Sequence, residues 1–240
     1  MRAHLYFTTL ALTLGWATCH GQEAGAVLSG EPVPPHLPFE PSMTLAVHSE
    51  DIHRPALGQG FTSGAKEAGF AVVGGFGLRA FGGRHPHDLT LGSLHYGWVF
   101  SDVVAKGHWY QGNWELLGEL FGGAQYNSRV AYLAGITPGL RYNFITGTRL
   151  VPFVHAGVGA TLTDIRAPDL GSTFEFNLQA GTGLQCFFRE NAAFTVQYRF
   201  IHISNAGIRQ PNQGLNAHAV FVGVSWFFGG ASPRPDTHGQ

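Results

Sequence analysis

The chain has 240 residues, a length that fits one domain or one barrel. Charged residues make up only 12% of it, about half the usual share of soluble domains. Lys and Arg (14) nearly balance Asp and Glu (15), which gives no electrostatic argument for a nucleic-acid partner. Gly (34) and Phe (19) are abundant. Low charge, many aromatic residues and no run of about 20 apolar residues after the N-terminus favour a transmembrane β-barrel over a soluble β-sandwich or a lipocalin-like barrel.

Residues 1–21 have the pattern of an export signal peptide. A basic start precedes an apolar stretch at residues 5–16, and small residues follow at candidate cleavage sites. Cys19 and Cys186 are the only two cysteines. Cleavage after Cys19 would leave one of them, so no intramolecular disulfide is expected in the mature chain.

Two further segments are predicted to lie outside the barrel. Residues 22–65 are rich in Pro, Gly and Ser, and the Pro residues of 31–41 exclude a helix or a central strand. This segment is predicted to be a mobile or loosely packed extension. Residues 230–240 are predicted to be a flexible tail, which leaves residues 66–229 for the barrel.

Eight candidate strands follow from alternating apolar and polar residues. In the sixth, the even-numbered residues are mostly apolar and the odd-numbered ones include Glu and several amides. Successive side chains of a strand point to opposite faces, so this pattern predicts an apolar outside and a small polar lumen. Glu115, Glu119, Arg141 and Arg199 on the polar faces could form a proton or ion pathway. A packed network is favoured, because narrow barrels fill their lumen with side chains. The predicted fold is an all-β, eight-stranded antiparallel transmembrane β-barrel with strands near 66–82, 88–104, 108–125, 129–145, 149–164, 173–189, 191–204 and 215–229.

The connections are predicted to alternate between the two sides of the membrane. Short ones at 105–107, 146–148 and 189–191 are assigned to the periplasm. Those near 83–87, 126–128, 165–172 and 205–214 are longer on average and are assigned to the outside, the usual asymmetry of such barrels. Trp226, Phe227 and Phe228 are expected in an aromatic girdle at the periplasmic end.

Chemistry concentrates in residues 193–228, two alternating strands around a polar loop. His202 and Ser204 continue the apolar face that ends in Phe200. On the following strand, Asn216 and His218 share the apolar face. A base and a hydroxyl that face lipid at the membrane boundary suit an enzyme that cleaves a lipid ester.

The residues from Phe200 to Asn216 resemble the lipid A 3-O-deacylase (PagL-type, acyloxyacyl hydrolase) family. The string His202-x-Ser-Asn-Ala-Gly, with Pro211-Asn-x-Gly after it, is far more specific than a lone Ser–His pair. The resemblance implies an outer-membrane enzyme of a Gram-negative bacterium that removes a primary ester-linked acyl chain from the lipid A part of lipopolysaccharide. Its active site would lie on the lipid-facing outside of the barrel, with lipid A and outer-membrane lipids as partners. No metal or organic cofactor is implied.

By this resemblance Ser204 is the nucleophile and His202 the general base. The family has a Glu where this chain has Asn216. An amide can orient an imidazole but cannot stabilise the imidazolium with a full charge. The departure predicts weaker catalysis, a substitute carboxylate or lost activity. The candidate substitutes are Asp164, Asp169 and Glu175, and His218 lies on the same face as Asn216.

Asn205, Gly207 and Asn212 are predicted to form the oxyanion hole, by resemblance and because a Gly- and Asn-rich loop can turn N–H groups inward. The alternative is that these residues form only a turn-rich external loop. His85 and His87 in another loop could bind a metal, although such an exposed pair is more often solvated.

The sequence is therefore compatible with three functions. The first is a serine-dependent lipid A deacylase that acts at the barrel surface. The second is a catalytically inactive or non-enzymatic structural or adhesive barrel, which Asn216 supports best. The third is a phospholipase or an esterase for another lipid.

Overall fold

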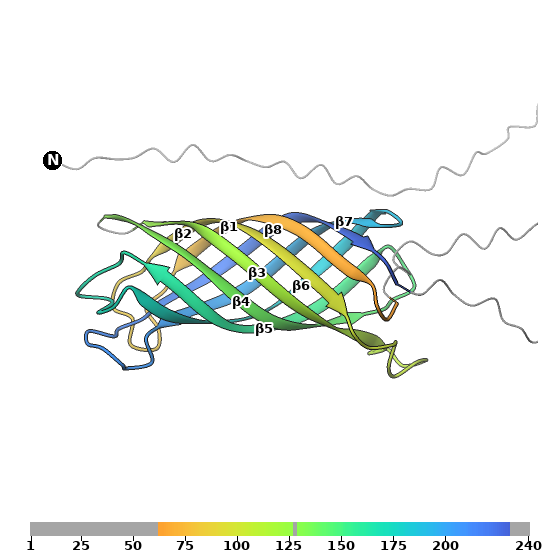
Figure 1. Ribbon diagram of the computed structural model, residues 1–240, viewed down its shortest axis with the longest axis horizontal. Coiled ribbons are helices and arrows are strands. Elements are labelled where there is room, and N and C mark those ends of the chain that lie inside the picture. The colour runs from red at the N-terminus through yellow and green to blue at the C-terminus, as the bar shows by residue number, and fades with distance from the viewer. Residues whose placement is uncertain (1–61, 127–128, 231–240) are drawn as a thin grey trace, which may run out of the picture. The chain divides into compact units, whose positions relative to one another are not determined.

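The computed structural model describes residues 62–126 and 129–230 (Figure 1). They form eight antiparallel strands, each paired with its neighbours in sequence, and β1 pairs with β8 to close the barrel. This confirms the predicted fold. The predictions for residues 1–21, for most of 22–65 and for 231–240 lie outside the described residues. The strands are β1 (Lys66–Gly77), β2 (Asp88–Val99), β3 (Gly112–Tyr126), β4 (Val130–Phe144), β5 (Leu150–Thr163), β6 (Phe174–Arg189), β7 (Ala192–Ser204) and β8 (Leu215–Phe228).

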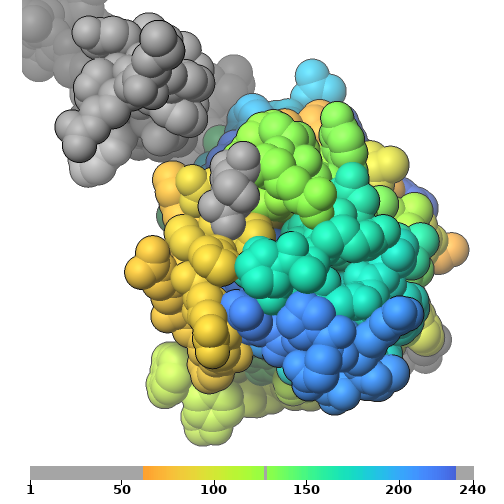
Figure 2. All heavy atoms as spheres, turned by 90° about the vertical axis from the view of Figure 1, so that its left-hand side faces the viewer, coloured from red at the N-terminus to blue at the C-terminus, as the bar shows by residue number. Residues whose placement is uncertain are grey.

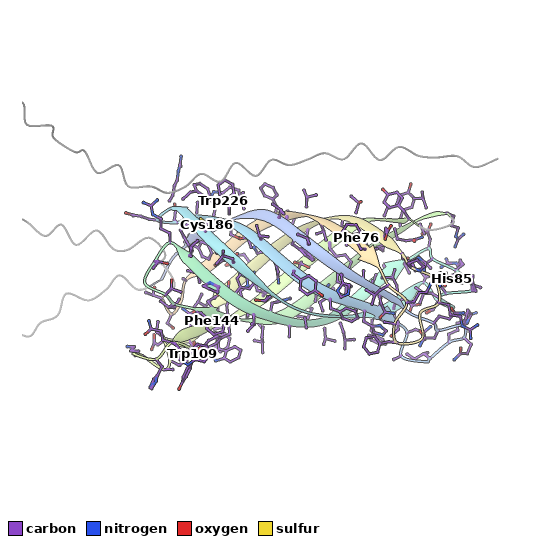
Figure 3. All side chains as sticks on the ribbon, turned by 180° about the vertical axis from the view of Figure 1, so that it is seen from behind. Phe76, His85, Trp109, Phe144, Cys186 and Trp226 are labelled. Atoms are coloured by element: carbon purple, nitrogen blue, oxygen red, sulfur yellow. The ribbon has the colours of Figure 1, made fainter. Side chains whose placement is uncertain are left out.

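Side chains alternate between the inside and the outside of the barrel along the strands. On β7, Phe194 and Val196 are exposed whereas Gln197 and Arg199 are buried. The outer wall therefore carries large apolar side chains that project away from the barrel (Figure 3), such as Phe76, which is 71% exposed. No helix in the described part of the chain is long and apolar enough to cross a membrane.

Aromatic side chains gather on the outer wall at the end where β8 finishes. Trp226 and Phe228 are exposed there, and Figure 3 shows Trp226 and Phe144 near the same end. The prediction for Phe227 was wrong, because its side chain is only 4% exposed. Successive residues of a strand point to opposite faces, so Phe227 points into the barrel while its two neighbours point outward. Its ring lies 5.1 Å from that of Phe187.

The middle of the barrel holds the predicted polar network. Arg141 forms ion pairs with Glu67 and Glu115, and its guanidinium lies 4.5 Å from the centre of the Phe153 ring. Arg199 donates to Glu119 at 2.8 Å in a second ion pair. All of these charged groups are buried. Each therefore depends on its partners inside the barrel, since a buried unpaired charge is costly.

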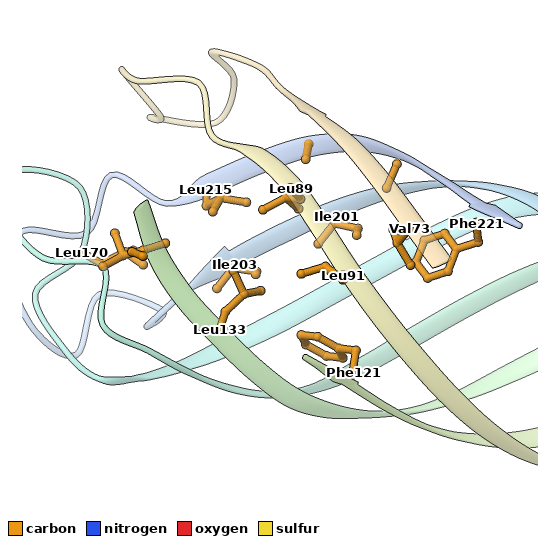
Figure 4. Close-up of a cluster of buried hydrophobic side chains, with 14 residues drawn as sticks. Val73, Leu89, Leu91, Phe121, Leu133, Leu170, Ile201, Ile203, Leu215 and Phe221 are labelled. Carbon is orange, nitrogen blue, oxygen red and sulfur yellow. The ribbon is translucent and has the colours of Figure 1, made fainter. Parts of the chain in front are cut away.

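Apolar clusters occupy both ends of the lumen, which corrects the prediction of a polar lumen throughout. Figure 4 shows the cluster under the β7–β8 loop, where Leu89, Ile203 and Leu215 lie together with Leu170. A second cluster at the opposite end includes Val99, Phe187 and Phe227. The polar network is thus enclosed between two apolar layers. Inward-facing positions near the strand ends carry aliphatic residues because the lumen is packed with side chains rather than open.

Glycines on the inner face make room for the largest inward side chains. A Cβ at Gly97 would lie 2.0 Å from Glu115 Oε1, and one at Gly183 would lie 2.3 Å from the Phe153 ring. The high glycine content therefore serves close packing in a narrow barrel.

Two of the connections are longer than predicted. β2 ends at Val99 instead of near 104, so the connection predicted to be a short turn spans residues 100–111. Trp114 N–H donates to Ser101 Oγ at 2.8 Å, and Val104 pairs with Gly112 in an isolated bridge. The Ser101 side chain thus takes up an N–H group of β3, and the β2–β3 ladder ends before Val103 and Val104, although Val is common in strands. The connections at this end, called the turn end below, are 100–111, 145–149 and 190–191.

The other end, called the loop end below, carries the connections 78–87, 127–129, 164–173 and 205–214. Figure 2 looks at this end, where the β1–β2 loop, the β5–β6 loop and the β7–β8 loop lie side by side. β1 ends at Gly77, earlier than predicted. Leu78 N–H then donates to Asn216 C=O at 2.9 Å, after which the loop turns across β8. This turn brings the loop to the residues singled out in the sequence.

Candidate active site

His202, Ser204 and Asn216 come together on the outer wall at the loop end. Ser204 is the last residue of β7, and His202 is directly opposite Asn216 in the β7–β8 ladder. His202 and Ser204 are half-buried, whereas Asn216 is 1% exposed. Their outward direction follows from the alternation that also exposes Tyr198 on the same strand.

A continuous chain of hydrogen bonds joins these residues. Ser204 Oγ lies 3.0 Å from His202 Nε2. His202 Nδ1 lies 2.7 Å from Asn216 Oδ1. Asn216 Nδ2 donates to the carbonyl oxygen of Ala80 at 2.6 Å. A hydroxyl, an imidazole and an orienting acceptor in this order are the arrangement that activates a serine nucleophile.

The β1–β2 loop contributes two groups that were not predicted from the sequence. One is the Ala80 carbonyl. The other is Phe81, whose ring lies 5.8 Å from the Phe200 ring and 6.2 Å from the His202 ring. Phe81 has a φ of 46°, a left-handed conformation that is rare for a bulky residue. The only sequence signal here is the Gly82-Gly83 pair, which indicates a tight turn but not what the turn contacts.

Glycine is also required where the β7–β8 loop enters β8. Gly214 has a φ of +76°, and a Cβ there would lie 3.2 Å from His202 Cε1. A larger residue would strain the backbone and press on the imidazole.

The predicted oxyanion-hole residues lie together in the β7–β8 loop, where they bond one another. Asn205 N–H donates to Asn212 Oδ1 at 3.0 Å, and Gly207 N–H donates to Asn205 Oδ1 at 3.1 Å. Asn205 Nδ2 donates to the Arg209 carbonyl at 2.8 Å. Asn205 is 2% exposed, so its side chain is the centre around which the loop folds.

The residues predicted to replace the family's carboxylate form hydrogen bonds with groups other than His202. Asp164 Oδ1 accepts from Tyr132 N–H at 2.6 Å. Glu175 accepts from Ser172 Oγ at 2.8 Å and faces inward. In the described part of the chain, Asp169 bonds to His85, and His218 bonds to the Tyr198 hydroxyl. Asn216 is therefore the residue that orients His202.

Asp169 links three of the loops at this end. Its Oδ1 lies 2.7 Å from His85 Nδ1, and its backbone carbonyl accepts from Gln213 N–H at 2.9 Å. His87 is buried, which corrects the expectation of a solvated pair, and its Nδ1 lies 2.7 Å from Gln125 Oε1. Figure 3 labels His85 at the loop end. Among the described residues, no group of three His, Cys, Asp or Glu side chains is arranged to hold a metal ion.

An apolar groove of about 810 Å³ runs along the outer wall from His202. Its lining includes Phe81 and Phe200 at the His202 end and the small residues Ala180 and Ala156 farther along. Ala156 pairs with Ala180, and Ala180 pairs with Phe200, so these residues form one row across β5, β6 and β7. The groove is open to the surroundings of the barrel and could hold an acyl chain beside the Ser204 hydroxyl.

Known proteins resemble this chain in sequence and in fold. The family model described as "Lipid A 3-O-deacylase (PagL)" matches residues 92–225. A lipid A deacylase PagL from Pseudomonas aeruginosa is 37% identical over 86 residues, which is 35% of this chain and 47% of that relative, so the match spans about half of the relative's length. A lipid A deacylase PagL from Bordetella bronchiseptica is 31% identical over 156 residues, which is 60% of this chain and 78% of that relative.

Solved structures with similar barrels include the outer membrane enzyme PagL, at 23% identity and a TM-score of 0.43, which covers 64% of this chain and 97% of that one. Neisserial surface protein A has 15% identity and a TM-score of 0.47, and covers 69% of this chain and all of that one. The family model spans more than half of the 240 residues, and the Bordetella relative is matched over most of its length. The chain is therefore a member of the lipid A 3-O-deacylase family.

Proposed function

We propose that the protein is an outer-membrane esterase that removes an ester-linked acyl chain from lipid A. The observation that carries the proposal is the hydrogen-bond chain from Ser204 through His202 to Asn216 on the outer wall of the barrel. Family membership supports lipid A as the substrate. The apolar groove beside His202 supports lateral entry, in which the acyl chain stays in hydrocarbon.

In the proposed reaction, Ser204 Oγ attacks the ester carbonyl carbon while its proton passes to His202 Nε2. The tetrahedral intermediate collapses, and the sugar oxygen leaves with the proton from His202. A water molecule then attacks the acyl-serine and gives its proton to His202. The acid is released, and Ser204 recovers its proton.

The oxyanion of the intermediate needs hydrogen-bond donors, for which Asn205, Gly207 and Asn212 remain the proposed sources. The N–H groups of Asn205 and Gly207 already donate to side-chain oxygens within the loop. An oxyanion beside Ser204 would replace one of these oxygens as the acceptor, so the proposal includes a small rearrangement of the loop.

Asn216 favours one alternative, a barrel of this family that no longer catalyses hydrolysis. The amide leaves the imidazolium of the intermediate without a neighbouring carboxylate. The intact Ser204–His202–Asn216 chain argues against this alternative, since a disused site is under no constraint to keep both of its hydrogen bonds. A phospholipase is the remaining alternative, and it predicts the same site with a different preferred lipid.

The test compares wild-type protein with Ser204→Ala, both refolded in detergent, on purified lipid A and on phospholipid. Wild type should release fatty acid from lipid A faster than from phospholipid, and Ser204→Ala should release none. Ser204→Ala removes only a half-buried hydroxyl, so the barrel should stay folded. Release by Ser204→Ala would refute the mechanism, and faster release from phospholipid would refute the substrate.

A further inference from the structure

We propose that the backbone carbonyl of Ala80 is a positioning group of the active site, because it makes an amide at position 216 equivalent to an orienting carboxylate. This inference rests on the proposed function of Ser204 and His202. It assigns a role to the β1–β2 loop, which contributes no side chain to the proton transfers.

The two ends of the Asn216 amide have different partners. One end lies 2.6 Å from the Ala80 carbonyl oxygen and the other lies 2.7 Å from His202 Nδ1. A carbonyl oxygen only accepts hydrogen bonds, so the NH₂ group must face Ala80. The amide oxygen then faces His202, and Nδ1 must carry the hydrogen of the neutral imidazole. Nε2 is left with its lone pair toward the Ser204 hydroxyl, as a base requires.

Without the Ala80 carbonyl, the Asn216 amide could adopt an orientation that impairs catalysis. An amide that turned its NH₂ group toward Nδ1 would place the imidazole hydrogen on Nε2, where it cannot accept a proton from serine. In chymotrypsin-type proteases, replacing the triad Asp by Asn leaves the geometry intact but lowers kcat about 10⁴-fold because the tautomer is wrong. The Ala80 carbonyl excludes that orientation here, since two acceptor oxygens would then face each other.

The β1–β2 loop holds the Ala80 carbonyl firmly in place. Leu78 N–H donates to the backbone carbonyl of Asn216 at 2.9 Å, and Gly83 N–H donates to the same Ala80 oxygen at 2.8 Å. Phe81 and Gly82, the central residues of this turn, have φ values of 46° and 93°. Turns of this kind favour Gly or Asn, so a Phe with positive φ indicates that its packing on His202 offsets the strain.

The site is therefore built for an amide and not for a carboxylate. In Asn216→Asp, a carboxylate oxygen would replace the donor that faces the Ala80 oxygen. In Asn216→Glu, the side chain would also be one methylene longer in a position that is 1% exposed. In both variants, Ser204 is expected to react more slowly than in wild type, with lipid A and with a serine-reactive label. This slower reaction is expected although each variant supplies the charge that the family's Glu provides.

The test measures the His202 tautomer and the reactivity of Ser204 in the full chain, refolded in detergent micelles. Nitrogen-15 NMR of labelled histidines distinguishes the two tautomers, with His202→Gln used to assign the signal. Labelling of Ser204 by a fluorophosphonate, mapped by peptide mass spectrometry, reports the activated hydroxyl independently of any lipid. Wild type should carry the hydrogen on Nδ1 and should label at Ser204.

Gly83→Ala perturbs the anchor without replacing any of the three side chains of the hydrogen-bond chain. The added Cβ would lie 2.9 Å from Asn216 Nδ2 and 3.1 Å from the Ala80 oxygen, so one of them must move. The matched control is Gly74→Ala on β1, where a Cβ would have nothing within 4 Å. Gly83→Ala should lower the labelling rate about 100-fold and shift the tautomer toward Nε2–H, whereas Gly74→Ala should match wild type.

Two results would overturn the inference. One is an Nε2–H tautomer in wild type, and the other is Gly83→Ala with wild-type tautomer and wild-type labelling. The proposed function is tested separately. Protein with the Nδ1–H tautomer and labelled Ser204 that leaves lipid A intact would refute the substrate and keep the positioning role. Hydrolysis of lipid A by wild-type protein that carries the hydrogen on Nε2 would refute the positioning role and keep lipid A as the substrate.

Discussion

Asn205 is the residue around which the β7–β8 loop is folded. Its side chain accepts from Gly207 N–H at 3.1 Å and donates to the Arg209 carbonyl at 2.8 Å and to Ser172 Oγ at 3.3 Å. These bonds join the β7–β8 loop to the β5–β6 loop directly after Ser204. A single buried amide thus sets the backbone beside Ser204, the proposed nucleophile.

Replacing Asn205 should impair catalysis much more than folding. Asn205→Ala removes the bonds that shape the loop and one proposed oxyanion donor, so kcat for lipid A should fall about 10²–10³-fold. Asn191→Ala at the turn end is the control and should keep wild-type kcat, because its carbonyl bond to Phe227 N–H is a backbone bond. Fatty-acid release checks both variants. An Asn205→Ala variant with wild-type kcat would exclude Asn205 from the site.

Three of the residues at the centre of the site were predictable from sequence. His202, Ser204 and Asn216 occupy alternate positions that share the apolar face of two neighbouring strands. The structure brings them together. The Ala80 carbonyl was not predictable, because every residue has a backbone carbonyl and this one lies 136 residues from its partner. The contact between Phe81 and His202 was not predictable either, since the sequence of a glycine-rich loop does not indicate which residues its Phe contacts.

The outer face of strands β5 and β6 provides the floor of the groove that starts at His202. Ala156 and Ala180 lie side by side there, and Leu140 and Leu178 also line the groove. Small side chains between larger ones create a depression on a wall that is otherwise covered with Leu, Val and aromatic residues. Its place beside His202 suits the acyl chain of an ester under attack.

Filling the groove should therefore slow cleavage of long acyl chains selectively. Ala180→Phe should lower kcat/KM for p-nitrophenyl myristate at least about tenfold while that for p-nitrophenyl butyrate changes little. Ala134→Phe on β4 adds the same ring to an outward position away from the groove and should leave both values unchanged. Equal losses for both esters in Ala180→Phe would show that the groove does not hold the chain.

Element boundaries were less predictable than element number. The eight strands follow from alternation, because the burial of one face and exposure of the other imposes a period of two. Their ends depend on side chains that intercept the ladder. Ser101 accepts the Trp114 N–H, and Asp88 Oδ1 accepts the Gly77 N–H at 2.9 Å, so β2 and β1 end before their apolar residues do.

The whole barrel encloses a charged layer between two apolar layers. Arg141 lies at its centre, paired with Glu67 and Glu115, and Arg199 pairs with Glu119 nearby. Amide side chains bond to the charged groups, such as Gln179, whose Oε1 accepts from Arg199 at 3.0 Å. Sequence parity predicted which of these residues face inward, but not their pairing, since a barrel interior brings together side chains from distant strands.

Removing the central cation should destabilise the barrel strongly. Arg141→Met removes the cation that two buried carboxylates share, so the free energy of unfolding should fall by about 3–5 kcal/mol. Arg149→Met, at an exposed position of the turn end, should change it very little. Urea unfolding in detergent micelles, followed by tryptophan fluorescence, measures both. Equal stability of the two variants would mean that the charged layer contributes no net stability.

The most direct test of the account is the mass of lipid A after incubation with the refolded wild-type protein. The proposed serine mechanism predicts the loss of one hydroxyacyl chain from lipid A, with no loss in a parallel incubation with Ser204→Ala. An unchanged lipid A mass, under conditions in which the barrel is folded, would contradict it. That result would mean that a site with Asn216 in place of a carboxylate does not cleave this lipid.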